Sequence, residues 1–107
     1  RRRPVIIRKG DVWDVDTGKG TRTVLVVSLD GLAEAYGAVL VLVLHAPAQH
    51  PDTAMSVRLT TPLDASAVAV NLLQLSTLHF ETGTPHGNIG PEQQELVDNS
   101  LRAVLDL

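Results

Sequence analysis

The period of the hydrophobic pattern changes once along this 107-residue chain, and that change restricts the fold more than any other feature. Before the change, apolar residues alternate with polar ones, as at 12–16, or run unbroken, as at 24–27 and 38–44. These patterns predict half-buried and central strands. Beyond them, apolar residues recur at helical spacing, which predicts an amphipathic helix starting within two residues of Pro91. Its apolar stripe comprises Val97, Leu101, Val104 and Leu105, with Leu96 beside it.

Shorter segments connect these elements. We expect a turn at 17–20, a helical turn at 32–36, a loop at 45–52, a strand at 55–60, two extended pieces at 68–73 and 76–80 with a bend at Gln74, and a loop at 82–90. Five or six short strands with one late helix, and no alternation of strands with helices, predict an α+β fold. A small antiparallel β-barrel fits this order better than an open sheet, in one domain that spans residues 1–107.

Composition excludes several classes of site. The chain has no cysteine, so disulfides, thiolate zinc sites and cysteine nucleophiles are excluded. Its net charge of −3 argues against bulk electrostatic capture of nucleic acid. Eight of the nine Lys and Arg residues nevertheless lie in residues 1–58, with only six of the twelve acids. Such a basic N-terminal half is able to contact phosphates. An ordinary solvent-exposed surface with a basic chain terminus would have the same composition.

Targeting signals are not visible in the chain. The longest apolar run, at 38–44, has seven residues, against roughly 20 for a membrane-spanning helix. Only residues 5–7 are apolar between the basic residues at the start of the chain, too few for a signal peptide. We therefore expect a soluble, cytoplasmic protein that has no membrane contact.

Four motifs follow one another in the order and spacing of a known family. Residues 8–16 (RKGDVWDVD) are similar to the RGDIW-x-VD opening of MazF/PemK toxins, and residues 21–28 (TRTVLVVS) to their RP-x-LVVS second strand. Residues 70–78 (VNLLQLSTL) resemble their VNLDQLRT segment. Residues 87–91 (GNIGP), with the helix that follows, match their G-x-L-(S/T)-x-EE ending. The resemblance covers residues 8–107.

This resemblance implies a fold, an activity and partners. The fold would be an SH3-like barrel of the CcdB/PemK type, assembled as a homodimer. The activity would be that of a type II toxin, an endoribonuclease that cuts single-stranded mRNA at short sequences without the ribosome. A cognate antitoxin would neutralise it by laying an extended, acidic C-terminal segment in the RNA groove. The family uses no metal ion and no organic cofactor.

Arg22 matches the catalytic arginine of the family. Metal-free RNA cleavage requires activation of the 2′-hydroxyl, stabilisation of charge on the phosphorane, and protonation of the leaving 5′-oxygen. An arginine suits the second task because its planar fork matches two phosphate oxygens and stays charged. Without the resemblance, Arg22 would be interpreted as a solvated arginine at a strand edge.

The family's partner for this arginine is a Thr or Ser just after the third strand, and His45 takes that place here. Histidine titrates near neutrality, so His45 is able to carry proton transfer beside Arg22. The alternative is that the hydroxyl is lost and His45 is a loop residue of a weakened or inactive toxin. The sequence leaves both interpretations open.

Lys19, Thr21 and Arg58 are candidate RNA-binding residues. The loop at 17–21 is shorter than that of the family, and Thr23 replaces the proline that usually follows the arginine. The remaining histidines, His50, His79 and His86, lack the paired spacing of metal ligands, so no metal site is expected. Trp13 is the only tryptophan, and at its place in a strand it is more often a core residue than a base-stacking one.

Three alternative functions do not involve RNA cleavage. A gyrase-directed poison would share the fold, since CcdB toxins do, but their mode depends on a tail that contains tryptophan, and this chain ends in Val104-Leu105-Asp106-Leu107. A toxin with a degenerate active site would bind only an antitoxin. A generic SH3-like barrel would bind some other partner, and its fold would reveal nothing of its chemistry.

Overall fold

The computed structural model describes residues 5–47 and 56–106. Within them the chain forms six strands, two α-helices and one short 3₁₀ helix. In chain order these are β1 (Asp11–Asp16), β2 (Thr21–Val26), α1 (Leu32–Tyr36), β3 (Ala38–His45), β4 (Ser56–Leu59), β5 (Ala65–Ser76), η1 (Thr77–Phe80), β6 (Thr84–Asn88) and α2 (Gly90–Leu105).

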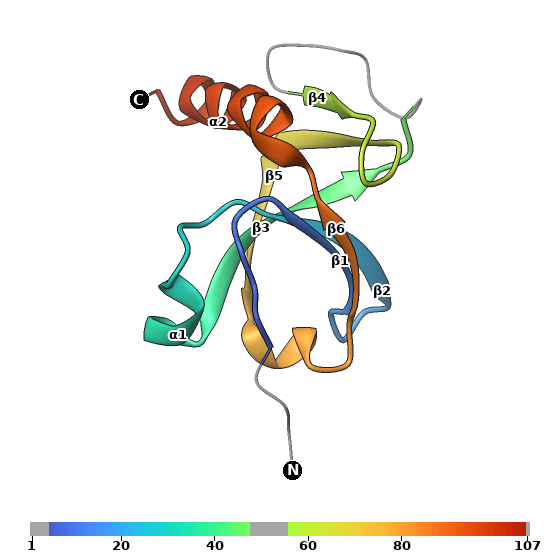
Figure 1. The fold of residues 1–107 in the computed structure, drawn as a ribbon, viewed down its shortest axis with the longest axis vertical. Coiled ribbons are helices and arrows are strands. Elements are labelled where there is room, and N and C mark those ends of the chain that lie inside the picture. Colours follow the sequence, from blue (N-terminus) through green and yellow to red (C-terminus); the bar gives the residue numbers. More distant parts are fainter. Residues whose placement is uncertain (1–4, 48–55, 107) are drawn as a thin grey trace.

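The six strands form one antiparallel sheet in the order β4-β5-β3-β2-β1-β6. The sheet is strongly curled, and α2 packs on β4 and β5 at one end of it (Figure 1). Strands β4 and β6 are the two edges, so the sheet is a partly open barrel. This architecture confirms the predicted α+β class, with an antiparallel barrel and a C-terminal amphipathic helix.

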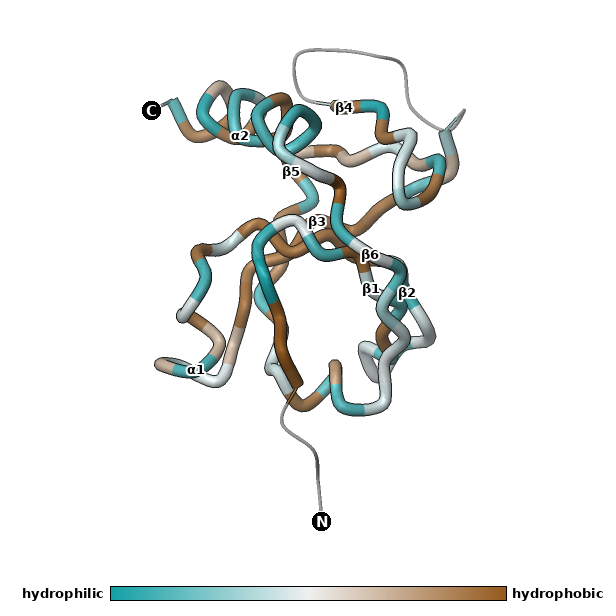
Figure 2. Tube along the Cα trace, in the orientation of Figure 1, coloured by the Kyte–Doolittle hydropathy of each residue, from teal (hydrophilic) through white to brown (hydrophobic). Residues whose placement is uncertain are grey.

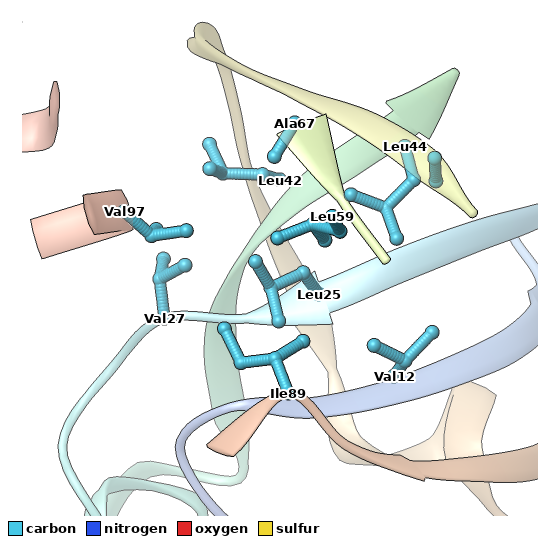
Figure 3. Packing of buried hydrophobic residues seen from close by; sticks show 10 residues of the cluster. Val12, Leu25, Val27, Leu42, Leu44, Leu59, Ala67, Ile89 and Val97 are labelled. Carbon is cyan, nitrogen blue, oxygen red and sulfur yellow. The ribbon is translucent and has the colours of Figure 1, made fainter. Parts of the chain in front are cut away.

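The sheet separates two groups of buried apolar side chains, because successive residues of a strand point to opposite faces. Leu25 and Leu42, which are neighbours across β2 and β3, belong to the first group, and α2 covers them with Val97. Figure 3 shows side chains of this group from β1 to β5 and from α2 gathered in one space. Val24 and Val41 belong to the second group, on the other face. The central strands are therefore buried on both faces, as their unbroken apolar runs predict.

Hydropathy along the chain follows the same division. Figure 2 shows hydrophobic residues along β3 and along the stretch before β1, whose Ile7 is buried in the second group. Along α2, hydrophilic and hydrophobic residues alternate. Val97 and Leu101 pack on the core, whereas Leu96 and Leu105 are exposed. The helix is therefore amphipathic as predicted, although its buried stripe does not extend to Leu105.

The start of α2 is fixed by one glutamine. The helix begins at Gly90 with Pro91 in its first turn, which confirms the predicted start. Gln93 accepts a hydrogen bond from the N–H of Thr60 at 2.8 Å and donates one to the carbonyl of Thr61 at 2.9 Å. These bonds tie the helix to the turn that follows β4. They therefore hold the β4 edge of the sheet in place.

Two short predicted features are also confirmed. The tight turn at 17–20 connects β1 with β2, and the helical turn at 32–36 is α1. Gly37 ends α1 in the left-handed conformation, with φ of 65°, and donates its N–H to the carbonyl of Ala33 at 2.8 Å. A residue with a Cβ is disfavoured in that conformation, which explains the glycine at this helix end.

The prediction of a loop at 82–90 was wrong. Residues 84–88 form β6, which pairs with β1 through the backbone. All five side chains of β6 are exposed, so the segment has no apolar alternation from which a strand is predicted.

The prediction of an extended piece at 68–73 is confirmed, but the bend at Gln74 and the second extended piece at 76–80 were wrong. Residues 65–76 form one long strand, β5, and residues 77–80 form η1. The Oγ of Ser76 accepts a hydrogen bond from the N–H of Leu78 at 3.2 Å, and this cap starts η1 where a further strand was expected.

Parts of two other predicted segments fall on residues 48–55, outside the described residues. Of the predicted loop at 45–52, His45 is the last residue of β3. Of the predicted strand at 55–60, residues 56–59 form β4, which confirms a strand there.

Replacement of Leu25 by Ala should lower the free energy of unfolding by about 2–5 kcal/mol, because the side chain is fully buried and its removal leaves a cavity. Leu78→Ala is the matched control, since that leucine is 60% exposed, and it should change stability by less than about 0.5 kcal/mol. Urea unfolding followed by circular dichroism measures both. Equal losses for the two variants would show that the first core group is not close-packed.

Candidate active site

The pairing of β2 with β3 decides where Arg22 lies relative to His45. Val24 lies opposite Val43 in this antiparallel pair. The ladder ends at this pair, and Arg22 on β2 and His45 on β3 each lie two residues beyond it. Because side chains alternate between faces, both residues lie on the face of Val24 and Val43. The structure thus brings these two sequence-predicted residues to one end and one face of neighbouring strands.

Arg22 presents an exposed guanidinium on a well-anchored backbone. It lies opposite Val15 of β1, whose side chain is buried in the second core group. Its Nη1 donates to the carbonyl of Thr21 at 3.2 Å. Within residues 5–47 and 56–106, Arg22 makes no ion pair. A guanidinium in this state is able to bind two oxygens of a phosphate with its fork.

His45 is half-buried at the end of β3 and is placed by β5. Its Nε2 lies 2.8 Å from Nδ2 of Asn71. In the β3–β5 ladder it lies opposite Ser66, a buried residue whose Oγ donates to the carbonyl of Pro47 at 3.3 Å. The ring is therefore held on one side by β5, in a position from which it is able to exchange protons.

A bulge in β5 brings Asn71 to this position. Leu42 pairs with Leu72, but two residues further along β3, Leu44 pairs with Ala67. Between these two pairs the chain advances by two residues along β3 but by five along β5. Asn71 lies in this longer stretch of β5. Bulges of this kind redirect side chains and bend a strand.

The turn between β1 and β2 places Lys19 and Thr21 close along the chain to Arg22. The carbonyl of Gly20 accepts hydrogen bonds from the N–H and the Oγ1 of Thr17, each at 3.1 Å. Lys19 is exposed at the tip of this closed turn, and Thr21 is exposed at the first position of β2. The two predicted RNA-binding residues therefore lie beside the arginine.

Arg58 is further away and already has a charged partner. It lies on β4 opposite Ser66 of β5, and Ser66 in turn lies opposite His45 of β3. Its Nε donates to Oδ1 of Asp64 at 3.0 Å and its Nη2 to Oδ2 at 3.0 Å. The bidentate ion pair offsets the charge of Arg58, so an RNA phosphate would compete with Asp64 for it.

Trp13 belongs to the core. The residue is only 7% exposed, and its ring packs edge-on against Phe80, with the ring centroids 5.4 Å apart and the planes at 78°. This contact packs Trp13 within the second core group, so its ring is not available to stack on an RNA base. His79 is engaged separately, with Nδ1 2.8 Å from the carbonyl oxygen of Asp16.

No group of three or more His, Asp or Glu side chains suited to a metal ion occurs among residues 5–47 and 56–106. His50 lies outside this part of the chain.

Comparison with known proteins decides the family. A sequence model of the PemK-like, MazF-like toxins of type II toxin–antitoxin systems matches residues 8–105. The chain belongs to this family. The match includes all four motifs that resemble the family, and it includes Arg22 and His45.

Solved structures share the fold of the toxin at low sequence identity. An endoribonuclease from a mycobacterial species, in complex with its cognate antitoxin, has a TM-score of 0.83 at 22% identity, covering 94% of the toxin and 96% of that chain. A MazE–MazF complex from Deinococcus radiodurans has a TM-score of 0.82 at 13% identity, covering 97% and 99%. The Mycobacterium tuberculosis toxin MazF-mt6 has a TM-score of 0.75 at 13% identity, covering 91% and 97%. No curated protein sequence matches the toxin.

In the described ranges, no helix combines the length and the apolar composition that a membrane crossing needs.

Sequence reasoning did not single out Asn71 or Ser66 as site residues. Asn71 is the one polar residue between apolar neighbours in the VNLL segment, which is the only signal that the sequence offers. Its partner is set by the bulge in β5, and a bulge cannot be located from side-chain alternation alone. Ser66 gives no such signal, because serine is common in short strands and turns alike.

A second polar group that the sequence did not reveal joins the β6 edge to the sheet. Asp14 Oδ1 accepts from Oγ1 of Thr23 at 2.7 Å and lies 3.0 Å from Nε2 of His86. Burial raises the pKa of Asp14, but the hydrogen bonds from Thr23 and His86 and the charge of protonated His86 outweigh this effect. The net pKa of Asp14 is therefore below its ordinary value.

Asp14→Asn should lower the free energy of unfolding of the toxin at pH 7, by up to about 1 kcal/mol, since the pair is partly exposed and screened by water. A lowered pKa means that the stabilisation by the carboxylate is present above about pH 4, the ordinary pKa of Asp, and is lost as the pH falls through the folded-state pKa. Urea unfolding of both proteins at about pH 7 and about pH 3 measures the difference, which should narrow at the lower pH. A difference that widens in acid would contradict this account of Asp14.

Proposed function

We propose that the toxin is a metal-independent, sequence-specific endoribonuclease of single-stranded mRNA, with Arg22 and His45 as its reactive pair. The observation that supports the proposal is the antiparallel pairing of β2 with β3, because Arg22 and His45 each lie two residues past its last pair, Val24 with Val43, at the same end of the two strands. Two mycobacterial proteins that share the fold over more than nine-tenths of both chains are themselves described as endoribonucleases. Membership of the PemK-like, MazF-like toxins supports the same class of reaction.

The proposed reaction needs only groups that this chain supplies, together with water. The 2′-oxygen attacks the adjacent phosphorus while the bond from phosphorus to the 5′-oxygen breaks. The 2′-hydroxyl loses one proton and the 5′-oxygen gains one, which leaves a 2′,3′-cyclic phosphate and a 5′-hydroxyl. Arg22 stabilises the negative charge on the non-bridging oxygens as the phosphorane forms. His45 exchanges the proton at one end of the reaction, and water exchanges it at the other.

The competing functions predict different outcomes in the same assay. A degenerate toxin that binds only its antitoxin would not cut RNA. A gyrase-directed toxin would not either, and the family that matches is the PemK-like, MazF-like one. We favour a working site because the histidine that replaces the family's hydroxyl residue is half-buried and held by a side chain of β5, unlike a loop residue that has drifted.

The RNA would lie along the row of residues that the sheet aligns with the reactive pair. Lys19 and Thr21 flank Arg22 on the β1–β2 side. Arg58 lies beyond Ser66 on the other side, where an RNA phosphate displaces Asp64 as its partner. In this arrangement Lys19 and Thr21 contact the chain near the cut, and Arg58 contacts a more distant phosphate.

A cognate antitoxin is the proposed protein partner. Two of the neighbouring structures are complexes of this kind, one with a cognate antitoxin and one of MazE with MazF. An extended, acidic C-terminal segment of the antitoxin would occupy the RNA groove and pair with Arg22 and Lys19. Neutralisation would then be competition between carboxylates and phosphates for the same cations, and it would weaken with salt.

Arg22→Ala should lower the single-turnover rate of RNA cleavage by about 10²–10³, the usual loss for one preorganised donor. His45→Ala should lower it by about 10²–10⁴, the usual range for a general acid or base. His45→Thr, which restores the family's residue, should retain activity with a flatter pH profile. Rates are measured on a long RNA in EDTA, by separating the fragments on a denaturing gel.

Arg102→Ala serves as the control, because this exposed arginine of α2 is bonded to Asn99 and lies outside the proposed groove. Its rate should equal that of the parent. If His45→Ala cuts as fast as the parent between about pH 5 and about pH 8, the histidine has no catalytic role.

We propose further that the toxin is a homodimer whose interface includes the surface around α1. Leu32, Tyr36 and Leu40 line a shallow hollow of about 300 Å³ there, which Gln74 of β5 completes. Leu72, opposite Leu42 on the next strand, extends the exposed apolar surface on the same face of the sheet. A twofold contact between two such surfaces would bury these side chains.

Tyr36→Asp should convert the dimer into a monomer, because it places a charge in the apolar interface. Multi-angle light scattering at micromolar concentration should report about twice 11.5 kDa for the parent and about 11.5 kDa for the variant. Leu78→Asp, on η1, is the control and should remain dimeric. A parent of about 11.5 kDa would refute the dimer, and a dimeric Tyr36→Asp would refute only its location.

A further inference from the structure

A histidine of η1 contacts the base of the turn that bears Lys19. Nδ1 of His79 lies 2.8 Å from the carbonyl oxygen of Asp16, the last residue of β1. Asp16 lies opposite Thr21, the first residue of β2. On the other side of β1, strand β6 ends opposite Asp14, so the ring bonds a part of β1 that β6 does not reach. The contact therefore fixes the end of the β1–β2 hairpin.

This contact lies at the end of the sheet that carries the proposed site. Arg22 lies opposite Val15 of β1, one residue away from the position that His79 bonds. The next residue of η1, Phe80, packs on Trp13 in the second core group, to which Val15 also belongs. The short helix therefore lies on the face of Arg22, and His79 lies beyond β1 from the arginine. It extends the row of residues that we propose to contact RNA.

The carbonyl oxygen determines which ring nitrogen of His79 carries a proton. A carbonyl oxygen only accepts hydrogen bonds, so Nδ1 donates in this contact. The neutral ring has a single N–H, which leaves the lone pair on Nε2. Among residues 5–47 and 56–106, the bond to Asp16 is the one hydrogen bond of the His79 side chain, and the residue is exposed. The ring thus presents an acceptor, held in one direction, to a ligand that carries a donor.

We propose that His79 accepts a hydrogen bond at Nε2 from a ribose 2′-hydroxyl of the bound RNA, at a nucleotide other than the one that is cut. This inference rests on the proposed function and adds to it a residue that favours RNA over DNA. The 2′-hydroxyl is a donor that every nucleotide of RNA carries and that DNA lacks. His79 binds the substrate and takes no part in proton transfer.

The first test needs no RNA. Long-range ¹H–¹⁵N correlation spectra of the histidine rings, taken at about pH 8, report which nitrogen carries the proton. His79 should be the Nδ1–H tautomer, which is the less common form of free histidine. His86 is the internal control and should be the opposite tautomer, because its Nε2 lies 3.0 Å from a carboxylate oxygen of Asp14. A predominant Nε2–H form of His79 would overturn the proposal.

The second test measures binding, in a His45→Ala background and in EDTA so that the RNA stays intact. Fluorescence anisotropy compares a single-stranded RNA with 2′-fluoro RNA of the same sequence, in which fluorine replaces the hydroxyl donor. His79→Ala should weaken binding of the RNA by about 3- to 10-fold, the value of one hydrogen bond. It should leave binding of the 2′-fluoro RNA unchanged. Equal losses for the two ligands would show a contact to phosphate or base and would overturn the proposal.

His86→Ala is the matched control for binding. Its ring is bonded to Asp14, which adjoins Val15 in β1 and so points to the face opposite to that of Arg22. The variant should bind both ligands as the parent does. A selective loss of RNA binding in His86→Ala as well would show that the effect is not specific to His79.

Two further variants separate the contact with RNA from the contact with the turn. An asparagine amide reaches the position of Nδ1, whereas a glutamine amide reaches that of Nε2. His79→Asn should therefore keep the bond to Asp16 but bind RNA as weakly as His79→Ala. His79→Gln should keep most of the preference for RNA over 2′-fluoro RNA. A His79→Asn variant with the full preference of the parent would show that the ring only holds the turn.

The two proposals fail separately. If the parent does not cut RNA but His79→Ala still loses affinity for RNA alone, the proposed activity is refuted and the contact of His79 stands. If the parent cuts RNA and His79→Ala binds both ligands as the parent does, the activity stands and the contact is refuted.

Discussion

The pairing of β2 with β3 is the constraint on which the rest of the structure depends. These strands lie in the middle of the sheet, and each is apolar on both faces, so their register is specified twice. Leu25 faces Leu42 in one core group, and Val24 faces Val43 on the other side. A slip of one residue would exchange the two faces, so each set of side chains would enter the core group that is packed for the other. Arg22 and His45 lie two residues beyond the last pair of this ladder, at one end of the two strands, so the proposed site depends on the pairing that the core also requires.

Local pairing of charges reconciles the net charge of −3 with the proposed binding of RNA. Several charges in the described residues are already engaged: Lys9 with Asp98, Arg58 with Asp64, and Asp14 with His86. Lys19 and Arg22, on adjacent parts of β2 and its turn, make no ion pair among residues 5–47 and 56–106. The field that a phosphate meets at the proposed groove is therefore set by these two cations more than by the total charge.

The sequence predicted those features that rest on the alternation of apolar residues or on motifs, and missed those that rest on the backbone. The runs at 24–27 and 38–44 predict central strands because burial on both faces demands them, and Pro91 marks the start of α2 because proline fits only the first helical turn. β6 was missed because it is held by backbone bonds to β1 and all its side chains are exposed. The resemblance supplied Arg22 and His45 as candidates, but no spacing in the sequence places Asn71 beside His45. That contact depends on the bulge in β5, which changes the register of the strand. The pattern of apolar residues does not reveal where such a bulge occurs.

The most direct measurement is a structure of the toxin with a single-stranded RNA whose 2′-hydroxyls are methylated, which blocks cleavage at the bound site. The account predicts one phosphate that contacts the guanidinium of Arg22 and the ring of His45 from the same protomer, with Asn71 still bonded to Nε2. An RNA whose phosphate contacts Arg22 while the ring of His45 lies out of reach would contradict the central claim that these two residues form the catalytic pair.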